Sequence, residues 1–146
     1  MEKQTVQNFE NHARVVPPFH FFVLPVLLIN VIWSLIELRH GISVGSVLAV
    51  LVAVALLMAA LFARLFALTV QDRVIRLEMQ LRMERLLSQE LRPRIPEFTA
   101  EQLIGLRFAG DDELPALARQ ALDEKLAHRK EIKKRVKNWR PDYLRT

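Results

Sequence analysis

Two uncharged apolar runs, separated by only seven residues, constrain the fold of this chain more than any other feature of its sequence. Residues 19–36 contain no Asp, Glu, Lys or Arg over 18 positions, and residues 44–63 contain none over 20 positions. Each run is long enough to cross a hydrocarbon layer of about 30 Å as a helix. The short segment between them carries charge and a glycine. The pattern therefore predicts two antiparallel membrane helices joined by a tight turn.

The charged residues lie mostly after the second run. From residue 64 onward there are 18 basic and 13 acidic residues, so the net charge of +5 resides in this part of the chain. Lys and Arg resist translocation across a membrane. The turn contains only Arg39, whereas residues 64–85 contain five arginines and the N-terminal flank contains Arg14. We therefore expect both termini on the cytoplasmic side.

The second run continues without a helix breaker. Gly and Pro are absent between Ser46 and Arg92, and the residues after Arg64 are good helix formers. A helix from about Val44 to Leu87 would extend well beyond the membrane, and the acid-first pairs Asp72/Arg76 and Glu78/Arg82 would support it. Pro93 and Pro96 are expected to end it.

These observations predict an all-α membrane protein: a two-helix transmembrane hairpin with a long second helix extending into the cytoplasm, then a small C-terminal helical module. Its segments are a cytoplasmic N-terminal segment (1–18), transmembrane helix 1 (19–37), a periplasmic turn (38–43), transmembrane helix 2 (44–66), a cytoplasmic helical stalk (67–90), a proline-containing linker (91–98) and the basic module (99–146). A secretory signal peptide is not expected, because mostly polar residues precede the first run.

A packing seam can be followed along the second helix, with a spacing that alternates between three and four residues after Ala53. Within the predicted span the seam consists mostly of small residues, and beyond the span it is rich in Val and Leu. Its members are Gly45, Ala49, Ala53, Leu56, Ala60, Ala63, Ala67, Val70, Val74, Leu77 and Leu81. Small residues let a second helix approach closely. Two partners remain open. Either the first span and the C-terminal module cover the seam within one chain, or the stalk forms a homo-oligomeric coiled coil.

The module should contain three short helices. Thr99 and Gln102 have the spacing of a capping box, with Phe98 placed to contact Leu103. Asp111 or Asp112 is expected to cap the second helix, whose inward face is Leu114, Leu117, Ala118, Ala121, Leu122 and Leu126. The third helix should span residues 129–138, with Ile132, Val136 and Trp139 on one side. Because three short helices form only a small core, we expect the module to pack against the stalk or against a neighbouring protein.

Two groups of polar residues are candidate contact sites. Asn30 and Ser34 are polar residues inside the first span, and we interpret them as helix–helix hydrogen-bonding groups rather than ligand contacts. A basic surface is predicted at Lys130, Lys133, Lys134, Arg135, Lys137 and Arg140. It is either a solvated cytoplasmic face or a contact for anionic lipid, an acidic protein or nucleic acid, with nucleic acid the least favoured.

No residue pattern here indicates catalysis. The four glycines form no phosphate-binding loop, no HExxH motif is present, and the absence of cysteine excludes thiolate metal sites and disulfides. We therefore expect no enzymatic activity, cofactor, metal or small-molecule substrate.

Several strings resemble an uncharacterised bacterial family of small two-pass membrane proteins, a domain of unknown function. They are QNFENHARVVPPFHF (7–21), FALTVQDRVIRLEMQLR (66–82), QLIGLRFAGDDELPAL (102–117) and IKKRVKNWRPDYLR (132–145). The resemblance implies a bacterial inner-membrane location and a two-span layout, and it brings no site residues.

The expected function is that of a structural, accessory or scaffold subunit that self-associates or joins a larger membrane complex. One alternative is a membrane tether that binds anionic lipid or nucleic acid through the module. Another is a small oligomeric channel or transporter, for which Asn30 and Ser34 are the available polar groups.

The predicted topology can be tested with a single engineered cysteine, because the chain has none. Gly41→Cys, in the turn, should react with a membrane-impermeant maleimide added to the periplasmic side of intact cells. Labelling that requires cell lysis would overturn the topology.

Overall fold

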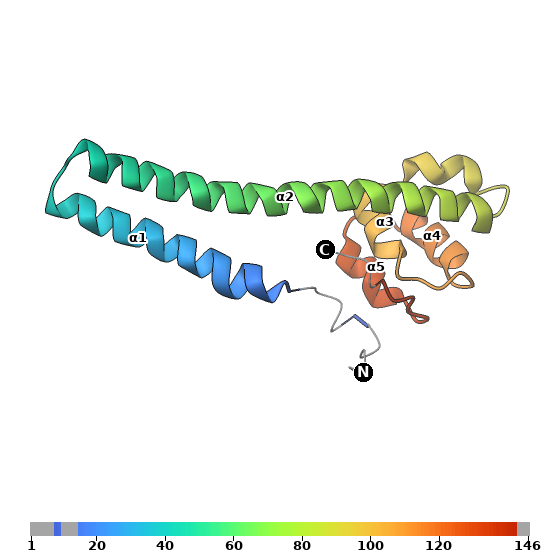
Figure 1. Cartoon of the computed structure of the whole chain (residues 1–146). Helices are drawn as coiled ribbons and strands as arrows, with labels where there is room; N and C mark the ends of the chain where they lie inside the picture. Colours follow the sequence, from blue (N-terminus) through green and yellow to red (C-terminus); the bar gives the residue numbers. More distant parts are fainter. Residues whose placement is uncertain (1–7, 10–14, 143–146) are drawn as a thin grey trace. The chain divides into compact units, whose positions relative to one another are not determined.

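The computed structural model describes residues 8–9 and 15–142, and every regular element in this part of the chain is a helix. The elements are a π-helical turn η1 (Phe19–Val23), helices α1 (Leu24–His40) and α2 (Val44–Leu86), a 3₁₀-helix η2 (Arg92–Glu97), and helices α3 (Ala100–Leu106), α4 (Leu114–Asp123) and α5 (Arg129–Arg135) (Figure 1). The chain forms two compact units, Arg14–Thr69 and a second that contains Val70–Arg145.

The first unit is the predicted hairpin. Helix α1 runs antiparallel beside the first half of α2 (Figure 1), and both helices are long and apolar enough to cross a membrane. Helix α1 continues to His40, so only three residues outside the helices form the turn. Within this turn the Ser46 hydroxyl accepts a hydrogen bond from the Ser43 N–H at 2.9 Å and donates to the Gly41 carbonyl at 3.0 Å.

Pro25 does not interrupt the first helix, because it lies in the first turn of α1. The π turn directly precedes it, with the Leu24 N–H donating to the Phe19 carbonyl five residues back. A proline removes the donor of an ordinary helical bond, and a π turn is a common local adjustment inside a helix. The span therefore remains continuous from Phe19 to His40.

The most buried residues of the hairpin are small. Ser34 on α1 and Ala53 on α2 are the buried residues of this unit among those described. Half-buried Val50, Leu57 and Ala60 continue the α2 contact line on either side of Ala53. Small side chains at positions such as Ser34 and Ala53 are compatible with close packing of two helices.

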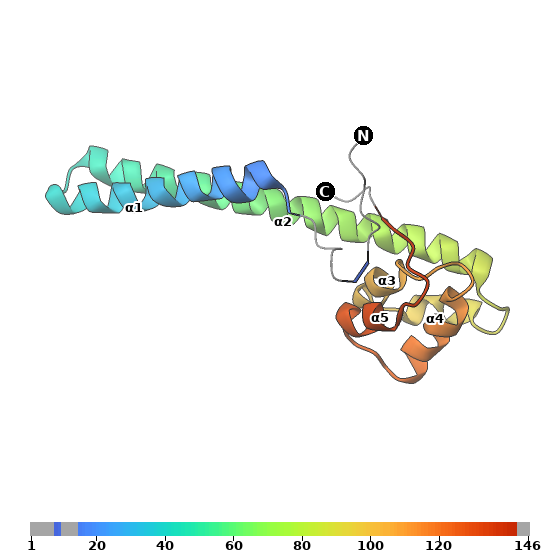
Figure 2. The same cartoon turned by 90° about the horizontal axis from the view of Figure 1, so that it is seen from below.

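The second unit is built on the C-terminal half of α2. Helices α3, α4 and α5 gather along this half of α2 (Figure 2). Ile75, Met79, Met83 and Leu87 form a stripe with a spacing of four residues and are all buried in one core with the module. The module thus leans on the stalk, and burying such side chains away from water stabilises the contact.

The module does not cover the Val/Leu stretch of the seam. One of the two alternatives left open by the sequence placed the module there, but Val70, Val74, Leu77 and Leu81 remain exposed. The structure therefore does not contain the intramolecular contact for this part of the seam. Helix α2 has two apolar stripes beyond the span, and the one with methionines is the one that packs against its own chain.

The capping box of α3 is present as predicted. The Thr99 hydroxyl accepts from the Gln102 N–H at 3.2 Å, and the Gln102 side chain accepts from the Thr99 N–H at 2.9 Å. The amide nitrogen of Gln102 also donates to the carbonyls of Ala121 and Leu126. A single buried glutamine therefore fixes the start of α3 and the end of α4.

The prolines of the predicted linker do not prevent helix formation. They fall within η2, where the Arg94 N–H donates to Leu91 and the Phe98 N–H donates to Ile95, each three residues back. The N–H groups of Pro93 and Pro96 are missing, but a short 3₁₀ turn tolerates their fixed φ angle. Ile95 and Phe98 are consequently buried in the core.

The remaining helices follow the expected faces but are shorter. Leu114, Leu117, Ala118, Ala121 and Leu126 are buried, and Leu122 packs partly against the same core. Helix α5 ends at Arg135, so Trp139 is not helical; its ring instead stacks on Phe108 with centroids 4.5 Å apart. The segment after α5 forms an isolated antiparallel bridge between Ala109 and Trp139.

The close crossing of α3 and α5 depends on Gly105. A Cβ atom at this position would lie 2.9 Å from Ile132 Cβ and 3.2 Å from the Arg129 carbonyl oxygen.

Gly105→Ala should therefore destabilise the module by about 1–3 kcal/mol. Thermal unfolding followed by Trp139 fluorescence, in a Trp33→Phe background, measures this loss. Gly45→Ala is the control, because its nearest atom is 3.7 Å away; equal stability of the two variants would contradict the packing.

Candidate functional site

Arg82 on α2 is a buried arginine at the centre of the second unit. Its Nε donates to Asp111 Oδ1 at 2.8 Å, and its two Nη atoms donate to the carbonyls of Arg107 at 3.1 Å and Ala109 at 2.6 Å. Burial lowers the pKa of Arg82 from its ordinary value, and the hydrogen bond with Asp111 opposes this effect. The guanidinium thus ties α2 to the loop after α3, and the predicted Glu78/Arg82 pair does not form.

The acidic run Asp111–Glu113 holds the C-terminal segment, which corrects the prediction that Asp111 or Asp112 caps a helix. The Glu113 carboxylate accepts from the N–H groups of Lys137 at 2.8 Å and Asn138 at 2.7 Å. Asp112 accepts from the Asn138 side chain at 3.0 Å, and Asp111 accepts from Arg140 at 3.3 Å. Helix α4 begins without a side-chain cap.

The Phe108 ring lies beside two cationic side chains and stacks on the Trp139 ring. The Arg107 guanidinium carbon lies 4.5 Å and Lys133 Nζ 4.8 Å from the centroid of the Phe108 ring, in addition to the stacked Trp139. Cations are attracted to aromatic faces, more strongly when water is excluded. Arg107 also pairs with Asp142 at 3.6 Å. This cluster fixes the end of the described chain against the loop after α3.

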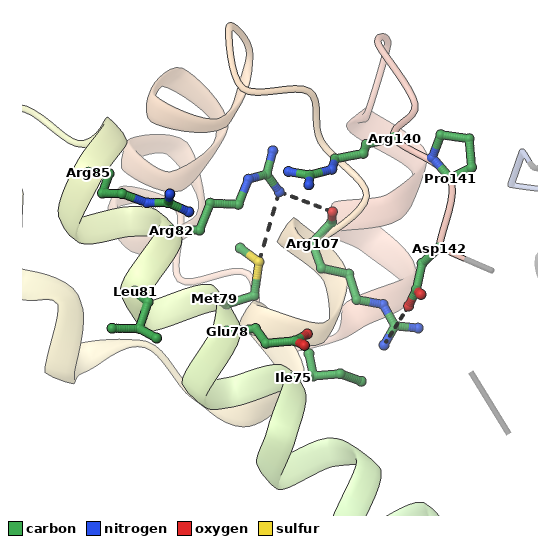
Figure 3. A pocket seen from close by; sticks show the side chains of 10 residues that line it. All are labelled: Ile75, Glu78, Met79, Leu81, Arg82, Arg85, Arg107, Arg140, Pro141 and Asp142. Atoms are coloured by element: carbon green, nitrogen blue, oxygen red, sulfur yellow. Dashed lines mark hydrogen bonds and ion pairs between the residues drawn. The ribbon is translucent and has the colours of Figure 1, made fainter. Parts of the chain in front are cut away.

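A pocket of about 640 Å³ opens between α2 and these two segments. Figure 3 shows its walls. Four arginines line it together with two acids and four apolar residues, namely Arg82, Arg85, Arg107, Arg140, Glu78, Asp142, Ile75, Met79, Leu81 and Pro141. No local sequence pattern indicates this site, because its arginines come from α2, the loop after α3 and the C-terminal segment.

The residues of the predicted seam do not all face the same surroundings in the structure. Ala53 is buried and Ala60 half-buried on the line that faces α1, whereas Gly45, Ala49, Leu56, Ala63 and Ala67 face outward from the hairpin. Beyond the span the seam is fully open, as described above. The seam is therefore not one surface: Ala53 and Ala60 support the hairpin, and the part from Val70 to Leu81 remains uncovered.

Asn30 and Ser34 do not act together. Ser34 is buried in the hairpin, and its hydroxyl donates to the Asn30 carbonyl at 2.8 Å. The Asn30 side chain faces outward. The Ser34–Asn30 bond lies within α1, so in residues 15–142 neither side chain makes the hydrogen bond between helices that was predicted for the pair.

Three of the six residues predicted to form a basic surface are buried or paired within the protein. Lys133 is buried, Arg135 pairs with Glu124, and Arg140 pairs with Asp111. Lys130, Lys134 and Lys137 are exposed. Lys130 and Lys134 also line a second pocket of about 470 Å³ with Glu101, His128, Arg129 and Glu131, a mixed-charge set.

Acid should loosen the second unit through Asp111. Its hydrogen bond with Arg82 holds the pKa of Asp111 below its ordinary value of 3.8. The stabilising contribution is thus complete above this value and is lost as pH falls through the lowered pKa. Asp111→Asn should lower the unfolding temperature at neutral pH and reduce its fall between about pH 5 and pH 2. Trp139 fluorescence measures both.

Asp72→Asn provides the control for this experiment, since Asp72 lies on α2 away from Arg82 and the structure gives it no ion pair in the described ranges. If this variant shows the same loss as Asp111→Asn, the Arg82–Asp111 contact does not carry the acid sensitivity.

Comparison with known proteins identifies the family of this chain. No curated protein and no solved structure matches the chain. One family model matches residues 1–146, the whole sequence, and its description is a family of unknown function (DUF6526). The chain therefore belongs to the DUF6526 family.

Proposed function

We propose that this protein is a non-enzymatic subunit of the bacterial inner membrane that assembles with copies of itself through the outer part of α2, with both termini in the cytoplasm. The observation that carries the proposal is the uncovered stripe of the stalk. Val70, Val74, Leu77 and Leu81 are 59%, 47%, 62% and 63% exposed. Four large aliphatic side chains aligned on one helix face are a costly surface to leave in water.

The position of the stripe on α2 favours a helical partner. Its spacing of four, three and four residues is that of the a and d positions of a coiled coil, with Val74 and Leu81 at a, and Val70 and Leu77 at d. The buried residues Ile75, Met79 and Met83 then occupy positions b, f and c, on the opposite side. The module of the same chain therefore covers one side of α2 and leaves the a/d side for another helix.

Charged residues beside the stripe favour a second copy of the same chain as the partner. Arg73 occupies a g position and Glu78 the e position five residues later, which is the spacing of a g–e′ ion pair between parallel helices. Both side chains are exposed, and neither has an ion pair within the part of the chain that the structure describes. Copies inserted in the same direction are parallel, so two such pairs would form across a symmetric dimer.

Disulfide crosslinking in native membranes tests this arrangement on a cysteine-free background. Leu77→Cys, at a d position, should form crosslinked dimers under mild oxidation. Arg76→Cys is the matched control, because it is exposed on the neighbouring c position and should crosslink far less. Equal crosslinking at the two positions would show random collision and would contradict the proposal.

Charge reversal tests the register. In the Leu77→Cys background, Arg73→Glu or Glu78→Arg alone should weaken association roughly five- to thirtyfold, since two attractive pairs become repulsive. The double variant should restore it, because the opposite charges face each other again. Dimer yield over a protein dilution series in nanodiscs or detergent measures the change. A double variant as weak as its parents would exclude the parallel g–e′ pairing.

A further inference from the structure

We propose that the arginine-lined pocket of the second unit binds an organic anion with a single phosphate group and an apolar body. The inference does not rest on self-association, because every wall of the pocket belongs to one chain. Its volume of about 640 Å³ lies within the range of small-molecule sites.

Positive charge in this pocket is only partly balanced by the protein. Arg82, Arg85 and Arg140 gather at one side of it (Figure 3), and Asp111 is the carboxylate that the first and last of them share. Like charge from Arg140 and Arg85 lowers the pKa of Arg82, after the larger effect of burial. The four lining arginines outnumber the carboxylates of Asp111, Glu78 and Asp142 by one, and an anion would stabilise this excess of positive charge.

The donors that could bind such an anion are those of Arg85 and Arg140. All three nitrogen atoms of the Arg82 guanidinium already donate within the protein. Arg85 has no hydrogen bond or ion pair in residues 15–142, and the Arg140 side chain uses only Nη1, toward Asp111. An arginine presents its N–H groups in a planar fork that matches a phosphate. Arg82 therefore supplies fixed charge, while its two neighbours supply free donors.

The other walls define the rest of the ligand. Ile75, Met79, Leu81 and Pro141 give the pocket an apolar side, which favours a ligand with an apolar body. Glu78 and Asp142 also line the pocket, and Glu78 has no ion pair in the described chain. These carboxylates disfavour a polyphosphate, because every added negative charge is repelled by them. A ligand with a single phosphate and an apolar body could bind the arginine donors on one side of the pocket and the apolar residues on the other.

Calorimetric titration of the full chain in phosphatidylcholine nanodiscs tests the proposal, with naphthyl phosphate as the probe. Naphthyl phosphate should bind at least tenfold more tightly than inorganic phosphate, which lacks the apolar body, and than naphthol, which lacks the anion. Equal affinity for all three compounds, or no binding, would overturn the proposal.

Variants of the lining residues make the test specific. Arg85→Gln and Arg140→Gln should each weaken binding of naphthyl phosphate roughly tenfold or more, because each removes charge-assisted hydrogen bonds. Arg85→Gln is decisive, since Arg85 is exposed and makes no hydrogen bond or ion pair in residues 15–142. Arg76→Gln, an exposed arginine of α2 outside the pocket, should bind like the original protein, whereas Glu78→Gln should bind more tightly. Unchanged binding by Arg85→Gln would overturn the proposal.

The source of the phosphate is decided by repeating the titration in nanodiscs that contain phosphatidic acid. Loss of naphthyl phosphate binding there, with recovery in phosphatidylcholine alone, would identify a lipid headgroup as the occupant of the pocket. Undiminished binding would identify a water-soluble organic phosphate.

Discussion

The second unit of this protein depends on one buried arginine. Arg82 lies on α2, the long helix of the second unit, and cannot be left without partners, because an unpaired buried charge costs several kcal/mol. Asp111 and two loop carbonyls satisfy it. These contacts fix the loop after α3, and the acidic run in this loop then holds the segment after α5. A helix that is long and apolar enough to cross a membrane is in this way joined to a module of three short helices.

The parts of this fold that are encoded locally could be predicted from the sequence. A span needs only an uncharged run, and the capping box at Thr99 and Gln102 needs only two residues three positions apart. The inward face of α4 follows from a period of 3.6 residues. Each of these signals is complete within about one helix. The structure accordingly agrees with the predicted capping box and α4 face, and it contains two helices long and apolar enough to span a membrane.

Contacts between distant residues could not be predicted in this way. Helix α2 beyond the span has two apolar stripes, and periodicity alone cannot decide which one its own module covers. The Asp111–Glu113 run has the composition of a helix cap, but its partners lie 24 to 29 residues away. The arginine-lined pocket cannot be predicted for the same reason, since it needs Arg85 and Arg140 on one side of a fold that no local pattern specifies.

The two proposed contacts share a wall of α2, and this sharing gives them a definite coupling. Leu81 belongs both to the open stripe and to the pocket, and Glu78 is both the e-position acid and a lining carboxylate. Pairing of Glu78 with Arg73 of a second copy would neutralise the carboxylate that most disfavours an anion in the pocket. An anion bound to Arg85 would in turn reduce the repulsion between the cationic faces of two stalks. Because coupling between sites is reciprocal, assembly and anion binding should strengthen each other by the same factor. A protein with no catalytic pattern in its sequence would thereby adjust its assembly to an anionic ligand through a single face of one helix.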